Sequence, residues 1–287
     1  MRGKCVSLGL ILGLAAGVAA GQAPNRTEVD SSALYCSGEI RTEAVPQDSY
    51  IISGERSLTK VVFSAPELVY INRGSAQGLK VGDEFRVVRP VKDLVYQEWF
   101  HGQRELLRAM GQAWTDLGRI RVTNVGAKVS TAQIVFSCDY MQRADIILPY
   151  EERQSIPLRP NNTAVDPYAP ATGKAGMVVT TKRFGQVAGL NSIVYVNLGS
   201  SQGAKPGDYM RIFRRQGNMS NVLYQTPGTE YKMLGFGTTP VVYTWGDLPR
   251  QILGEGVVVR VTGNTATVMI TATRGEVYAG DYVEIEQ

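Results

Sequence analysis

Histidine is almost missing from this chain of 287 residues, in which His101 stands alone. Imidazole is the commonest metal ligand and a frequent general base, so this scarcity argues against a His-based metal site or catalytic relay. An excess of one charge is missing too: 30 Lys and Arg face 26 Asp and Glu, for a net charge of +4. That balance is too even to predict binding to nucleic acid or to an acidic membrane surface.

Long apolar runs are missing except at the N-terminus, where residues 6–20 are apolar or small apart from Ser7. Arg2 and Lys4 precede this run, and Val18 and Ala20 fit a small-residue cleavage site. The pattern predicts a secretory signal peptide over residues 1–20. A membrane anchor is the alternative, although the run is shorter than the roughly 20 residues that cross a bilayer. We expect an exported chain that does not span the membrane after cleavage.

Cysteine is scarce, and after loss of the leader only Cys36 and Cys138 remain. Oxidising compartments preserve disulfides, so the two residues are a candidate disulfide. The alternative is two separate small hydrophobic residues, and the sequence leaves this choice open. A pair of cysteines without neighbouring histidines does not predict a zinc site.

An internal repeat organises the rest of the chain. Residues 70–89, YINRGSAQGLKVGDEFRVVR, match residues 195–214, YVNLGSSQGAKPGDYMRIFR, at 11 of 20 positions with an offset of 125. A second stretch recurs at an offset of 136, where Leu117-Gly118 matches Leu253-Gly254 and Ala144-Asp145 matches Gly280-Asp281. The repeat predicts an N-terminal extension, a first unit, a proline-rich semi-rigid linker and a second unit. The ranges are 21–48, 49–150, 151–173 and 174–287.

Short runs rich in Val, Ile, Tyr and Phe, bounded by Gly, Asn and Pro, predict an all-β fold. Ala132, Ile134 and Phe136 fall on one face of a run and Thr131 and Gln133 on the other, and the second unit keeps this phase. We expect two tandem β-barrel or β-roll units of five or six strands each; a single large sandwich is the alternative. Apolar residues at roughly helical spacing predict one amphipathic helix over about residues 97–113, inserted in the first unit. In the second unit we expect an irregular loop or hairpin at this place.

Repeated Gly-Asp pairs indicate turns rather than a metal site, because no D-x-[DN]-x-[DN] cluster surrounds them. The predicted structural turn residues are Gly82, Asp83, Gly207, Asp208, Asp145 and Asp281. Aromatic residues in the two insertions are candidates for a partner interface, although packing on their own barrel is the commoner outcome. These candidates are Trp99, Phe100, Trp114, Tyr243 and Trp245. Repeated arginines could instead line a groove for an anionic glycan or partner; they are Arg86, Arg89, Arg211, Arg214 and Arg215.

Residues 199–203 fit G-x-S-x-G, but they precede a turn and a strand, whereas a nucleophile elbow opens a helix. The matching position of the first unit is Ala76. A Walker loop, H-E-x-x-H and a dinucleotide fingerprint are all missing. We therefore expect neither an enzyme nor a cofactor.

Residues 69–89 and 130–137, followed by Ala144-Asp145-Ile146-Ile147, resemble the C-terminal domain of flagellar assembly protein T. Similar copies follow peptidoglycan-binding LysM domains in envelope proteins of Gram-negative bacteria. The resemblance implies two small barrel-like domains without a catalytic centre, located in the periplasm. We expect a structural or interaction module with an envelope protein as partner, in a cell-envelope, flagellum- or pilus-type assembly. The alternative is a module that binds an envelope glycan such as peptidoglycan. Oligomeric state stays open.

Overall fold

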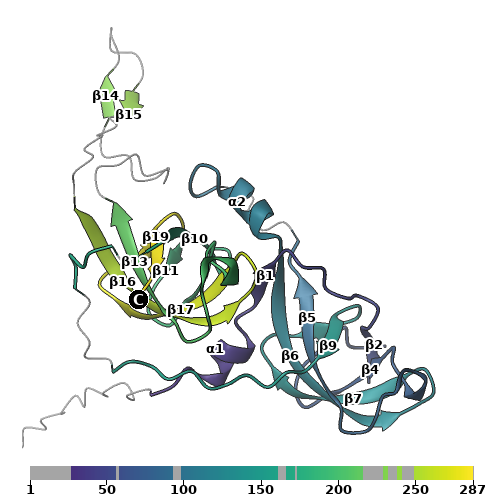
Figure 1. Ribbon diagram of the computed structural model, residues 1–287. Coiled ribbons are helices and arrows are strands. Elements are labelled where there is room, and N and C mark those ends of the chain that lie inside the picture. The colour runs from purple at the N-terminus through teal and green to yellow at the C-terminus, as the bar shows by residue number, and fades with distance from the viewer. Residues whose placement is uncertain are drawn as a thin grey trace, which may run out of the picture.

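The computed structural model describes residues 27–55, 58–92, 98–160, 166–171, 173–215, 229–231, 238–240 and 249–286. The predicted signal peptide lies outside these residues, as do Tyr243 and Trp245. The described chain is all-β and carries two barrel-like units, with one short helix, α2, inserted in the first (Figure 1). The predicted fold class is confirmed.

The first unit is a sheet whose main strands follow the order β2-β4-β7-β6-β5-β9. Its two outer strands also meet, through a bridge between Tyr50 and Ile146 and a 2.9 Å hydrogen bond from the Ile51 N–H to the Asp145 carbonyl. The sheet is thus nearly closed, which leaves little free edge. Its elements are β2 (Ile51–Gly54), β3 (Val62–Phe63), β4 (Leu68–Ile71), η1 (Ser75–Gln77), β5 (Glu84–Pro90), α2 (Gln103–Met110), β6 (Gln112–Val125), β7 (Ser130–Ser137), β8 (Met141–Gln142) and β9 (Ile146–Pro149).

The second unit is a closed barrel in the equivalent order, β10-β12-β17-β16-β13-β19. Its insertion between β13 and β16 contains a hairpin of β14 and β15. The elements are β10 (Ala175–Thr181), β11 (Val187–Ala188), β12 (Ile193–Val196), η2 (Ser200–Gln202), β13 (Tyr209–Arg215), β14 (Thr229–Tyr231), β15 (Thr238–Pro240), β16 (Arg250–Val261), β17 (Ala266–Thr273), β18 (Val277–Tyr278) and β19 (Tyr282–Ile285).

The two units share their strand register as well as their order. Tyr70 lies opposite Thr131, and Tyr195 lies opposite Thr267. The ladder between β6 and β7 shifts register after Arg119, and the ladder between β16 and β17 shifts after Glu255. These pairs are the ones that offsets of 125 and 136 align. The sequence repeat is therefore a repeat of backbone geometry.

The helix α2 is shorter than predicted, because it spans only Gln103–Met110. Gly102 before it has φ 84° and Gly111 after it has φ 102°, backbone conformations that glycine adopts without strain. Directly after Gly111 the chain enters β6. Some of the apolar residues that made the predicted helix too long belong to this strand, whose residues 113 and 114 are buried.

The N-terminal segment, residues 27–48, lies between the two units (Figure 1). It contains α1 (Ser31–Tyr35) and β1 (Glu39–Arg41), and β1 pairs with the start of β6. The linker packs along this segment, since the Val29 N–H donates to the Ile156 carbonyl at 2.9 Å. Segment and linker together join the barrels.

Each barrel has its own apolar core, and a third core lies at the junction. The junction core combines Ile40 of β1 with Phe100 and Met110 around α2, and with Val179 and Met269 on the outside of the second barrel. Burial of these side chains stabilises one particular arrangement of the two units. No helix in the described part of the chain is long and apolar enough to cross a membrane.

Candidate functional site

The predicted turn residues hold matching turns in the two barrels. The Asp83 carboxylate accepts a hydrogen bond from the Lys80 N–H at 2.9 Å, and Asp208 accepts one from the Lys205 N–H at 2.8 Å. Gly82 and Gly207, directly before these acids, have φ of 95° and 90°. Such a φ favours glycine, which explains the repeated Gly-Asp pair.

Asp145 and Asp281 cap the second pair of turns and also bind arginine. Each accepts a backbone N–H, from Gln142 (2.6 Å) and from Tyr278 (2.7 Å). Arg89 donates two hydrogen bonds to Asp145, at 2.7 and 2.8 Å. Arg214 does the same to Asp281, with both distances 2.7 Å. Burial raises the pKa of Asp281, and the hydrogen bonds from Arg214 oppose that rise.

Other arginines of the predicted anionic groove also contact groups of the chain itself. Arg211 lies 3.1 Å from both Glu284 and Glu286. Arg215 lies over the ring of Tyr282, with 5.3 Å from its guanidinium carbon to the ring centroid. Across the described residues, no group of three or more His, Cys, Asp or Glu side chains could hold a metal ion. The repeated charged side chains thus interact with other groups of the barrels.

Cys36 and Cys138 are joined by a disulfide, with 5.4 Å between their Cα atoms. Cys36 follows α1, and Cys138 follows β7 of the first barrel. The bond therefore fastens the N-terminal segment to the first unit.

Three of the predicted interface aromatics lie inside the molecule. Phe100 is 1% exposed and belongs to the junction core, where the partly buried Trp99 packs against it. Trp114 is 4% exposed and packs with Val45 and Val88. Phe100 therefore packs in the junction core, and Trp114 packs between the N-terminal segment and the first barrel.

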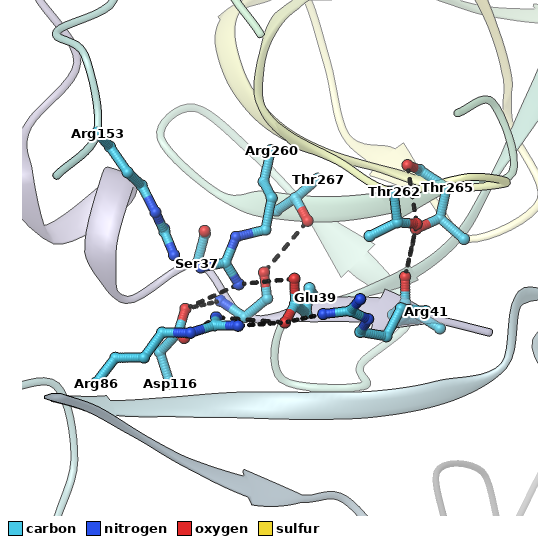
Figure 2. A network of polar contacts seen from close by, with 12 residues as sticks. Ser37, Glu39, Arg41, Arg86, Asp116, Arg153, Arg260, Thr262, Thr265 and Thr267 are labelled. Carbon is cyan, nitrogen blue, oxygen red and sulfur yellow. Dashed lines mark hydrogen bonds and ion pairs between the residues drawn. The ribbon is translucent and has the colours of Figure 1, made fainter. Parts of the chain in front are cut away.

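An ionic network crosses the junction (Figure 2). Arg86 of the first barrel lies 3.3 Å from Glu39 and 3.7 Å from Asp116. Arg260 of the second barrel lies 3.3 Å from the same Glu39 and 3.4 Å from the same Asp116. Glu39, Asp116 and Arg260 are buried. Buried charges need partners, so removing one member would leave the others uncompensated.

Hydrogen bonds to the backbone of the N-terminal segment reinforce this network (Figure 2). Thr265, directly before β17, donates to the Ile40 carbonyl at 2.5 Å, and the Tyr195 hydroxyl donates to the Ser37 carbonyl at 2.8 Å. Burial, and then the charges of Asp116 and Glu39, raise the pKa of Tyr195, which keeps its hydroxyl a donor. Gly38 has φ +70°, and a Cβ there would collide with the Tyr195 hydroxyl. Tyr70, the match of Tyr195, is only half-buried.

A pocket of about 330 Å³ lies between α1 and the first barrel. Its aromatic wall contains Tyr35, Tyr150 and Phe136, and the two tyrosine rings stack with centroids 5.8 Å apart. Arg119 covers Tyr150 at 4.6 Å, and Arg153 covers Tyr35 at 5.4 Å. We call this site the Tyr–Arg pocket. Burial raises the pKa of Tyr150 to about 12, so the phenol stays protonated at neutral pH.

The sequence prediction missed the Tyr–Arg pocket, because its residues come from α1, β5, β6, β7 and the linker. A signal existed in the positions at which the two repeats differ. At an offset of 136, Arg119, Phe136 and Tyr150 align with Glu255, Ala272 and Glu286. A strand face whose charge differs in sign between two copies of one fold indicates a function that belongs to one copy only.

No protein-family model matches the chain, and no curated protein matches it. The resemblance to the C-terminal domain of flagellar assembly protein T therefore stays a prediction from sequence motifs.

Proposed function

We propose that this protein is a non-catalytic structural or interaction module of the bacterial cell envelope. It is exported by its signal peptide to the periplasm, where it takes part in a flagellum- or pilus-type assembly. The observation that carries the proposal is that the repeated polar residues contact other groups of the same chain. Asp83, Asp145 and their counterparts hold turns, while Arg86 and Arg260 tie the barrels together.

Two further features support this proposal, one for the location and one for the role. The disulfide between Cys36 and Cys138 is of a kind that oxidising compartments preserve. The N-terminal segment, the disulfide and the junction core fix the two barrels relative to each other. Such a rigid arrangement suits a structural component of an assembly.

Cell fractionation tests the location. We expect the full chain to reach the periplasm of a Gram-negative host with Cys36 and Cys138 oxidised, as shown by thiol alkylation. The matched control lacks residues 1–20 and should remain in the cytoplasm with both thiols reduced. Equal thiol oxidation in the two compartments, or retention of the full chain in the cytoplasm, would contradict the proposal.

Crosslinking tests the role. We expect crosslinks from the periplasmic protein to a defined envelope protein, with little retention on purified sacculi. The second candidate function, binding to peptidoglycan or another envelope glycan, is favoured by the tyrosines and arginines of the Tyr–Arg pocket. Saturable retention on sacculi without protein crosslinks would support this alternative instead.

A further inference from the structure

The second barrel shows what the equivalent of the Tyr–Arg pocket binds when its charges are reversed. There Glu255 and Glu286 occupy the positions of Arg119 and Tyr150. Arg159 of the linker lies 3.8 Å from Glu255, forms an ion pair with Glu286 and covers the Tyr209 ring at 3.9 Å. In the second barrel, this face therefore binds a cation that the chain itself provides.

The correspondence between the two sites extends to the backbone. Arg119 pairs with Arg86 across the β5–β6 ladder, and Glu255 pairs with Arg211 across the β13–β16 ladder. The Tyr150 N–H donates to the Glu84 carbonyl at 3.1 Å, as the Glu286 N–H donates to the Tyr209 carbonyl at 2.9 Å. The difference between the sites therefore lies in their side chains.

In the first barrel three arginines, Arg86, Arg119 and Arg153, line the pocket against two acids, Asp116 and Glu151, which leaves a net positive charge. Glu84 is shared by Arg119 (3.1 Å) and Arg121 (2.6 Å), so a single carboxylate faces two guanidinium groups. Among the described residues, no carboxylate lies within ion-pair distance of Arg153. Its guanidinium donates to the Leu34 carbonyl and lies over Tyr35. A guanidinium has five N–H donors, so Arg119 and Arg153 each retain N–H groups that can donate to a ligand.

The shape of the pocket complements this charge. Phe136 lines it where the second barrel has Ala272, which adds an aromatic wall. A volume of about 330 Å³ is at the lower end of the range for small-ligand sites. An aromatic wall with charged donors at its ends suits a ligand that has a ring or an apolar group beside an anionic group.

We propose that the Tyr–Arg pocket binds a small carboxylate whose charged group lies between Arg119 and Arg153. The ring or apolar part of the ligand contacts Tyr35, Tyr150 and Phe136. The shared chemistry has two sources, a sugar acid of the envelope glycan or the terminal carboxylate of a peptide. This binding does not depend on the envelope assembly role, so either proposal can fail alone.

Calorimetric titration of the purified full chain tests the proposal with two acids and their neutral counterparts. The acids are N-acetylmuramic acid and N-acetyl-L-phenylalanine; the counterparts are N-acetylglucosamine and N-acetyl-L-phenylalanine amide. We expect saturable binding of at least one acid, at least about tenfold tighter than its neutral counterpart. The acid that binds identifies the source. Failure of both acids to bind up to about 10 mM, or equal binding of the neutral compounds, would overturn the proposal.

Substitutions locate the site. Arg119→Gln and Arg153→Gln should each weaken binding of the acid by about tenfold or more. The matched control is Arg121→Gln, which loses an ion pair to the same Glu84 outside the pocket and should leave the affinity unchanged. Equal losses in all three variants would overturn the assignment. If a variant fails to fold, amide NMR of the unmodified protein decides: ligand-induced shifts must centre on residues 118, 119, 136 and 150.

Discussion

Asp83 and Asp208 perform one task in two barrels, each accepting the N–H of the lysine three positions earlier. The spacing explains why the acid recurs with the glycine before it. Sequence reasoning could find these turns because every atom of the motif lies within four residues. It could not join Arg89 to Asp145, since their contact spans 56 residues and depends on the ladder between β5 and β9.

The first prediction concerns these capped turns. Asp83→Ala and Asp208→Ala should each lower the free energy of unfolding by about 0.5–2 kcal/mol, by analogy with the loss of a helix cap. Asp83→Asn is the control, because its side-chain oxygen still accepts the Lys80 N–H. Urea unfolding in the presence and absence of calcium measures the effect. A calcium-dependent stability that either alanine variant abolishes would show that these acids bind an ion.

The second prediction concerns Glu255, whose pKa is raised above its usual 4.5 by burial and then by the nearby Glu286. The folded state thus holds this proton more tightly than the unfolded state does. The contribution of Glu255 to stability is therefore largest below pH 4.5, and it decreases as the pH rises through the folded pKa. Glu255→Gln cannot ionise, so its stability relative to the unmodified protein should increase from pH 4 to pH 7.

Urea unfolding at several pH values measures this difference between the Glu255→Gln variant and the unmodified protein. The exposed Glu276→Gln serves as the control and should show no such trend. A Glu255→Gln variant that loses stability progressively toward pH 7 would contradict the prediction.

At the scale of elements, the N-terminal segment is the largest difference between prediction and structure. β1 is short, and its three residues carry no alternating pattern that sequence analysis can detect. The strand is stable because its partners come from both barrels. The run Ile193–Val196 carried no distinguishing signal either. All four of its side chains are buried whereas those of β4 alternate, although both runs are entirely apolar.

The third prediction concerns the disulfide that fastens this segment. Cys36 and Cys138 are 102 residues apart, so the bond restricts a long loop in the unfolded chain. Cys138→Ser should lower the free energy of unfolding by about 2–5 kcal/mol. The unmodified protein should lose a similar amount when dithiothreitol is added, whereas the variant should not respond. A loss of stability of the variant on addition of dithiothreitol would show that the reductant does not act through this disulfide alone.

At the scale of the whole molecule, the two barrels form one body because the junction has both a core and an ionic network. The repeat in the sequence predicted two units of one fold, and the topology agrees. It did not predict their contact, because a junction depends on the positions where the repeats differ. Tyr195 and its half-buried match Tyr70 illustrate this difference.

The fourth prediction tests the junction. Arg260→Ala removes the charge that the second barrel contributes to Glu39 and Asp116, and it should cost about 3–5 kcal/mol. Because each barrel also has its own core, differential scanning calorimetry should then resolve two transitions where the unmodified protein has one. The exposed Arg274→Ala is the control and should keep a single transition. A single unshifted transition in Arg260→Ala would show that the network does not couple the barrels.

The position of β1 also determines the order in which the molecule can be completed. Ile40 is synthesised early. The hydrogen bond that its carbonyl accepts from Thr265 cannot form until a residue 225 positions later has been made. Cys36 and Cys138 are 102 positions apart, so the disulfide can close before the second barrel exists. Long-range contacts of this kind form slowly, and domains generally fold from the N-terminus onward. A chain cut short before Thr265 could thus fold its first barrel but would expose the Gly38 and Ile40 carbonyls that Thr267 and Thr265 should cover. That uncovered strand would mark the truncated chain as incomplete for proteases and chaperones.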